Sequence, residues 1–224
     1  MTDQDQINKA KEFNILGREA AGTGDYEEAA DFFEKAAKIY ERIDDHINRG
    51  LQLFSLANCY ATLIRNDQAL DIYRESYDLI KDNDKLLEYQ AMILNNLGHL
   101  CVSMRNYDEG RNSFEKALGI FETVKNEKAQ AFQYQNIGSV YRDQRESKDA
   151  LEAYSKSIAI FKKVGYKLGE ADQCTNIAYI YSVDRNATEA LTWYKKAYEI
   201  YVDLDEDYKS DLTKTNIEQL EKAV

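Results

Sequence analysis

Asparagine recurs at one fixed interval from residue 96 onward. The members of this row are Asn96, Asn136, Asn176 and Asn216, at steps of 40 residues. A side-chain amide offers one acceptor and two donors, so it can pair with both the N–H and the C=O of an extended peptide backbone without recognising its side chains. The spacing therefore predicts a row of amides that can hold a peptide, provided that the elements carrying them stack in register.

These amides belong to a repeat of the same length. Each copy contains an aliphatic residue followed by a small one, which we call the marker pair: Leu16-Gly17, Leu56-Ala57, Leu97-Gly98, Ile137-Gly138 and Ile177-Ala178. A period of about 40 residues is typical of stacked two-helix units, because one such unit cannot bury its own apolar face and packs on its neighbours. Each of the first three asparagines of the row directly precedes a marker pair, so the row runs along the first helices of successive units.

Apolar spacing predicts two helices in each unit. In the fourth copy Tyr134, Ile137, Gly138 and Tyr141 follow the i, i+3, i+4, i+7 pattern of a buried helix face. A second helix follows with the pattern small, aromatic, small, as in Ala150, Tyr154 and Ser157. Small residues let two helices approach closely while the aromatic ring fills the space between them. The chain contains no proline, which leaves these helices uninterrupted.

Together these residues resemble the tetratricopeptide repeat, in its long branch that includes kinesin light chains and bacterial peptide-responsive regulators. The resemblance implies an all-α fold, a right-handed α–α superhelix, in a single domain over 1–224. The expected helix-turn-helix repeats are 8–47, 48–87, 88–128, 129–168 and 169–207, followed by a capping helix over 208–224.

In this family partner peptides lie on the concave side, which the first helices line. Neighbouring helices pack about 8–10 Å apart and an extended chain rises about 3.3 Å per residue, so one amide can serve roughly every third ligand residue. Neutral hydrogen bonds contribute only about 0.5–1.5 kcal/mol each, so apolar anchors must add to a micromolar affinity of about 8 kcal/mol. The expected peptide-binding residues are the amides Asn58, Asn96, Asn136, Asn176 and Asn216, the anchors Phe54, Met92, Phe132 and Tyr179, and the basic residues His99 and Arg142.

Each of these residues also has a structural interpretation. Asparagine at this position can tie adjacent repeats together instead of contacting a ligand. Phe54 and Phe132 are compatible with packing at the edge of the core, and Arg142 is followed by Asp143, with which it can form a local surface pair. The sequence leaves both interpretations open.

Composition limits the partner and the compartment. A formal net charge of −11 disfavours nucleic acid and anionic lipid, which require a basic surface. No stretch of eighteen apolar residues occurs and the first residues are acidic, so we expect a cytoplasmic protein without membrane insertion. Cys59, Cys101 and Cys174 lie in helical sequence without metal-ligand spacing and are expected to fill the core.

No catalytic, cofactor or metal-binding constellation is evident. The chain has two histidines and neither a Gly-rich phosphate loop nor a GxSxG turn. We therefore expect a non-enzymatic adaptor that binds a protein or peptide segment, without a cofactor, and that is a monomer because both ends of the array are polar. Two alternatives stay open: a regulator that responds to a diffusible peptide, and a solenoid that assembles with itself.

Overall fold

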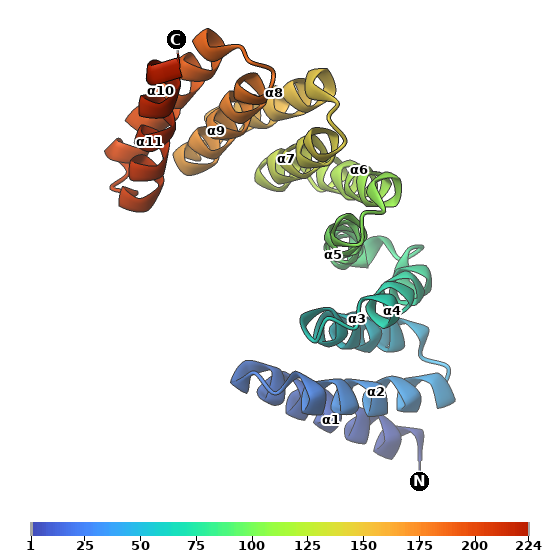
Figure 1. The fold of residues 1–224 in the computed structure, drawn as a ribbon. Coiled ribbons are helices and arrows are strands. Elements are labelled where there is room, and N and C mark those ends of the chain that lie inside the picture. Colours follow the sequence, from blue (N-terminus) through green and yellow to red (C-terminus); the bar gives the residue numbers. More distant parts are fainter. Residues whose placement is uncertain (1, 224) are drawn as a thin grey trace. The chain divides into compact units, whose positions relative to one another are not determined.

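Helices account for all regular structure in the described part of the chain, residues 2–223 of a computed structural model (Figure 1). The elements are α1 (Asp3–Thr23), α2 (Tyr26–Arg42), α3 (His46–Thr62), α4 (Asn66–Ile80), the 3₁₀ helix η1 (Asp84–Leu86), α5 (Leu87–Ser103), α6 (Tyr107–Thr123), α7 (Glu127–Asp143), α8 (Ser147–Lys163), α9 (Lys167–Val183), α10 (Ala187–Asp203) and α11 (Asp207–Ala223). Among these residues, no helix combines the length and the apolar character needed to span a membrane.

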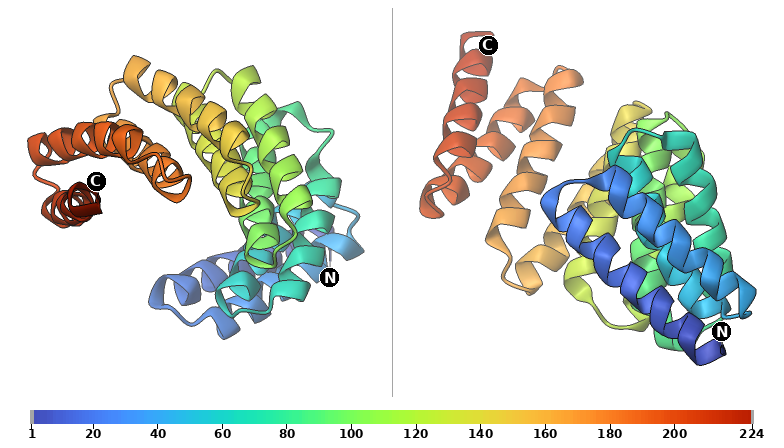
Figure 2. Two further views of the ribbon diagram at one scale, coloured as in Figure 1. Left: turned by 45° about the horizontal axis from the view of Figure 1, so that its top comes forward. Right: turned by 90° about the horizontal axis from the view of Figure 1, so that it is seen from below.

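The predicted fold class is confirmed: within residues 2–223, five helix pairs are followed by one unpaired helix. The odd-numbered helices are called leading helices here. Each of α1, α3, α5, α7 and α9 packs against the helix that follows it, and Figures 1 and 2 show the two lying side by side. Every leading helix begins slightly before the predicted start of its repeat, by five residues at Asp3 and by one or two elsewhere. The chain divides into two compact units, unit 1 over residues 1–120 and unit 2 over 121–224, and the division falls inside α6.

The marker pair is explained by a close contact between the two helices of a repeat. A Cβ added to Gly98 would lie 2.6 Å from Cε1 of Phe114, and one added to Gly138 would lie 2.8 Å from Cδ1 of Tyr154. Real Cβ atoms do not approach other atoms so closely, so a larger residue forces the helices apart. The small residue of the marker pair is therefore required by the aromatic residue sixteen positions later.

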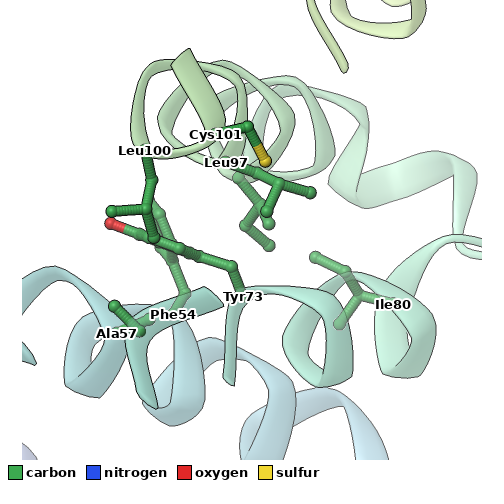
Figure 3. Packing of buried hydrophobic residues seen from close by; sticks show 9 residues of the cluster. Phe54, Ala57, Tyr73, Ile80, Leu97, Leu100 and Cys101 are labelled. Carbon is green, nitrogen blue, oxygen red and sulfur yellow. The ribbon is translucent and has the colours of Figure 1, made fainter. Parts of the chain in front are cut away.

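Buried aromatic and aliphatic side chains fill the space between successive pairs. In unit 1, Tyr73 of α4 is 2% exposed, and the centroid of its ring lies 6.2 Å from that of Phe54. Figure 3 shows Tyr73 reaching toward Leu100 of α5, so that one ring connects three helices. In unit 2 the corresponding Tyr154 is fully buried in a cluster with Ile177 and Tyr201. The three cysteines are free and buried, as predicted.

The turns inside the repeats use a left-handed residue where glycine is the usual choice. Gly24 has φ 86°, and Ile64, Arg105, Arg145 and Arg185 occupy the same place with φ between 59° and 63°. Side chains are disfavoured in this region, most of all β-branched ones such as Ile64. Asp25 and Asn186 accept hydrogen bonds from the backbone N–H groups of Glu28 and Glu189, as expected for N-cap residues.

The last helix closes unit 2 with a charged side. At the positions where α9 has Ala171, Cys174, Ala178 and Tyr181, α11 has the exposed residues Asp211, Lys214, Glu218 and Glu221. A further helix would have to bury these charges in order to pack there. Helix α11 thus has the character of the predicted capping helix.

One position varies in chemistry between repeats. Gln90 donates from Nε2 to the carbonyl of Ile80 at 3.0 Å, and Gln130 donates in the same way to that of Phe121 at 3.0 Å. The next repeat has Glu170 at this position, 3% exposed, and its Oε2 atom has no hydrogen-bond partner. A carboxylate cannot donate, and near the carbonyl end of a helix it lies in an unfavourable field.

Replacing Glu170 by Gln should stabilise unit 2 by about 1 kcal/mol. The amide can donate to the carbonyl of Phe161, as Gln130 does to Phe121, and it removes a buried acceptor without a partner. The substitution also ends ion pairs of 3.6–3.8 Å with three lysines, but these ammonium groups are substantially exposed and such pairs contribute little. Urea unfolding of both proteins would measure the change, and a lower stability of the glutamine variant would contradict this account.

Candidate functional site

The predicted amides of unit 1 bind to one another. Asn58 Oδ1 accepts a hydrogen bond of 2.6 Å from the Tyr73 hydroxyl and one of 2.9 Å from Asn96 Nδ2. Asn14 Nδ2 on α1 donates in the same way to Gln52 Oε1 on α3, at 2.7 Å. These bonds join successive leading helices, so the side chains one before and one after the marker pair share a surface, which we call the leading-helix face.

The two acceptor bonds fix the orientation of the Asn58 amide. Its Oδ1 atom is engaged, so its Nδ2 donors remain for another acceptor. Burial raises the pKa of the Tyr73 phenol to about 12, which keeps the hydroxyl protonated and donating at neutral pH. The structure thus shows the repeat-tying role of Asn58 and Asn96 and leaves the Asn58 N–H groups available.

The predicted anchors of unit 1 differ in exposure. Met92 is 48% exposed on α5, where a solvated helix usually has a polar residue. Phe54 is only 6% exposed and belongs to the core, so its assignment as a ligand contact is corrected: packing against Tyr73 buries the ring. The His99 and Phe114 rings pack in a T-shaped arrangement with their centroids 5.0 Å apart, and desolvation lowers the pKa of the His99 imidazole.

Amides also connect the leading helices of unit 2. Gln173 Nε2 on α9 donates to Gln135 Oε1 on α7 at 2.7 Å, and Asn176 Nδ2 donates to Gln173 Oε1 at 3.1 Å. Asn136 is engaged in an interaction as well. Asn216 on α11 is partly exposed, and no side-chain hydrogen bond links it to another residue of the described range 2–223.

Of the two aromatic anchors predicted in unit 2, one is packed and one is exposed. The centroid of the Phe132 ring lies 5.1 Å from that of Phe161 and 5.9 Å from that of Tyr166, so Phe132 of α7 packs against α8 and the turn that precedes α9. Tyr179 is 50% exposed on α9. Tyr179 is therefore the aromatic side chain of this face that a ligand can reach.

A hollow of about 500 Å³ lies beside Tyr179, between the end of α7, the beginning of α8 and the end of α9. Arg142 lines it and donates from Nε and Nη2 to Asp143 Oδ1, at 3.0 and 2.8 Å. The structural interpretation of Arg142 as half of a local ion pair is thus correct, and the residue nevertheless faces a cavity. The size is that of a pocket for a side chain or a small ligand.

Only Arg142 and Tyr179 of the residues that line the hollow were among the predicted site residues. Arg145, Ser147 and Val183 line it together with Tyr179. Arg145 lies in the turn between α7 and α8, and Val183 is the last residue of α9, so the apolar spacing within helices does not identify either of them. A signal was nevertheless present, because the same position in the four other repeats has small or polar residues: Gly22, Thr62, Ser103 and Asp143.

Metal-binding groups and cysteine thiols can be assessed within residues 2–223. No three His, Cys, Asp or Glu side chains among them are grouped closely enough to hold a metal ion. Burial raises the pKa of Cys59, Cys101 and Cys174 to about 11, so these thiols are protonated at neutral pH. The arrangement can bind through amides, one ion pair and exposed apolar side chains.

A family model described as "Tetratricopeptide repeat" matches residues 14–82 and 89–163. These two ranges include the marker pairs of the first four repeats. No curated protein matches the sequence.

Solved structures match over most of the chain. BtubC (BKLC) from P. vanneervenii is 18% identical, with a TM-score of 0.76, and the match covers 91% of this chain and 89% of that one. The apo form of RapI is 16% identical, with a TM-score of 0.81 and coverage of 92% and 74%. A putative kinesin light chain with TPR-like repeats from Podosopora anserina is 14% identical, with a TM-score of 0.75 and coverage of 89% and 98%. At these identities the likeness concerns the fold.

Proposed function

Because the chain belongs to the tetratricopeptide repeat family, a fold of protein–protein interaction scaffolds, we propose that it binds an extended segment of a partner protein on its leading-helix faces. One observation carries the proposal: the leading-helix face of each unit keeps a large apolar side chain about half exposed, Met92 in unit 1 and Tyr179 in unit 2, beside amides already oriented by their neighbours. Exposed apolar groups next to fixed hydrogen-bonding groups are typical of peptide-recognition surfaces.

The amides and the anchors contribute differently. Asn58 and Asn96 bond to each other across two leading helices, and Asn176 bonds to Gln173 on its own helix. Their remaining hydrogen-bonding groups orient a peptide backbone at about 0.5–1.5 kcal/mol each. The exposed side chains supply the larger part, since truncation of a central aromatic contact costs about 2 kcal/mol or more. Because those amides are ordered before binding, they lose little conformational entropy when the ligand arrives.

Replacing Tyr179 by Ala should weaken peptide binding tenfold or more. A twelve-residue peptide selected from a random library against the whole protein serves as the probe, and fluorescence anisotropy measures its affinity. Helical content and melting temperature should stay close to those of the unaltered protein, because half of the Tyr179 surface is already solvated.

Val164→Ala is the matched control, since Val164 is 37% exposed in the turn at the opposite end of α9. It should leave the affinity unchanged. The double variant Asn136→Ala with Asn176→Ala should also weaken binding about tenfold, and some loss of stability is expected because both amides are engaged. Equal affinities of the unaltered protein, the Tyr179 variant and the double variant would reject the leading-helix face as the binding site.

A further inference from the structure

The hollow of unit 2 is lined by two exposed apolar side chains that the repeat fold does not require. Tyr179 and Val183 stand one helical turn apart on α9, and they are 50% and 60% exposed. Ile180, between them in sequence, is 3% exposed and forms the floor. Two large, exposed apolar side chains thus line the hollow on either side of a buried one.

Tyr179 and Val183 both differ from the residues at the same positions of the other repeats. The position of Val183 has small or polar residues in each of the other four, and the position of Tyr179 has Arg18, Asn58, His99 and Ser139. These repeats fold without an apolar residue at either position. The repeat scaffold therefore does not require the two apolar side chains of the fifth repeat, and two of them beside one hollow form an exposed apolar patch.

The opposite side of the hollow supplies a positive charge. On this side Arg142 forms an ion pair with Asp143. The other carboxylate of the lining, Asp184 at the end of α9, accepts a hydrogen bond of 3.1 Å from the Ser147 hydroxyl and keeps its negative charge. The Arg145 side chain forms no ion pair or hydrogen bond with any residue of the described range 2–223. Its guanidinium keeps all five donors for a ligand, in the planar arrangement that suits a carboxylate.

We propose that this hollow is a specificity pocket for an acidic residue followed by an aliphatic or aromatic one in the bound segment. The carboxylate pairs with Arg145, and the apolar side chain packs on Tyr179 and Val183 over Ile180. The acidic residue is internal to the segment, because the leading-helix face continues past the hollow to Asn176 and Asn216. This assignment rests on the proposed function and adds which residues of a partner the protein selects.

Capped dipeptides test the pocket without knowledge of the partner. Acetyl-Glu-Leu-amide and acetyl-Gln-Leu-amide are titrated into the whole ¹⁵N-labelled protein, and amide chemical shifts report where each binds. The glutamyl peptide should perturb the amides of Ser147, Tyr179 and Val183 in a saturable manner, at millimolar concentration. Its affinity should exceed that of the glutaminyl peptide about fivefold, and 0.5 M NaCl should reduce this preference.

Two variants separate the charged from the apolar part. Arg145→Gln should abolish the preference for the glutamyl peptide, whereas the control Lys148→Gln, one turn away on the exposed side of α8, should retain it. Val183→Ser, which restores the type of residue found in other repeats, should weaken both dipeptides by a similar factor of about five. Circular dichroism verifies that each variant is folded.

The outcomes distinguish this inference from the proposed function. Equal affinities of the two dipeptides, a preference retained in Arg145→Gln, or shifts confined to other surfaces would each overturn the pocket. If the selected twelve-residue peptide still loses affinity in Tyr179→Ala, the leading-helix face remains the binding surface in that case. A dipeptide preference that depends on Arg145, with no effect of Tyr179→Ala on the longer peptide, would support the pocket and overturn the extended binding mode.

Discussion

Replacing Gly98 by Leu should destabilise unit 1 by about 3 kcal/mol. Even the first carbon of the new side chain would lie 2.6–2.9 Å from three atoms of the Phe114 ring. Phe114 is 1% exposed, so the ring cannot move aside into solvent, and α5 and α6 must separate instead. For a chain of this length such a loss corresponds to a decrease in melting temperature of roughly 6–12 °C.

Gly119 provides the control for this prediction. It lies in the same unit, in the interior of α6, and an added Cβ meets nothing within 4 Å. Gly119→Leu should therefore stabilise the helix by about 0.8 kcal/mol, because leucine has the higher helix propensity. Urea unfolding of both variants measures the difference. A Gly98 variant as stable as the unaltered protein would show that the marker pair does not set the distance between the two helices.

Removing the Asp172 carboxylate should release α11 from unit 2. Asp172 Oδ1 accepts a hydrogen bond of 2.8 Å from the hydroxyl of Tyr201 and one of 2.6 Å from Lys209 Nζ, so a single oxygen joins α9, α10 and α11. Burial raises the pKa of Tyr201, and the hydroxyl therefore stays protonated as a donor. In Asp172→Ala the hydroxyl keeps only its 3.2 Å contact with Thr175 Oγ1, and Lys209 loses its partner.

The Asp172→Ala variant should lose about 2 kcal/mol of the free energy that holds α11 in place. This value is at the lower end of what two charge-assisted hydrogen bonds contribute, because the side chains of Lys209 and Asp172 are 35% and 34% exposed. Amide hydrogen exchange in Asp207–Ala223 should accelerate by roughly thirtyfold. Asp211→Ala removes an exposed carboxylate from α11 itself and should leave the exchange unchanged. Equal protection of α11 in both variants would mean that apolar packing alone holds the last helix.

Much of the fold could be predicted from residue spacing. The marker pairs lie where the two helices of a repeat meet. At Gly98 and Gly138 only glycine fits, because an added Cβ would come too close to Phe114 and Tyr154. The absence of proline predicted uninterrupted helices, and the charged residues of α11 predicted a closing helix. Local sequence carries this information because helix formation and close approach depend on residues within one repeat.

The candidate site was predicted less completely. Helical phase placed Met92 and Tyr179 on an accessible face, but it also placed Phe54 there, which the structure buries against Tyr73. An aromatic side chain at the edge of a helix face can point to solvent or to the core, and the choice depends on the neighbouring repeat. Arg145 was not predicted because a turn residue has no periodicity that relates it to a helix face.

The sequence by itself determined the number of repeats, the helices within them, the buried stripe of each helix and the acidic character of the surface. These properties follow from the period of the apolar residues and from composition. Tertiary structure alone decided that Asn58 accepts from Asn96, that Gln135 accepts from Gln173, and that Arg145, Tyr179 and Val183 line one hollow. Such contacts depend on how far neighbouring helices are displaced along their axes and on side-chain rotamers, which residue spacing leaves undetermined.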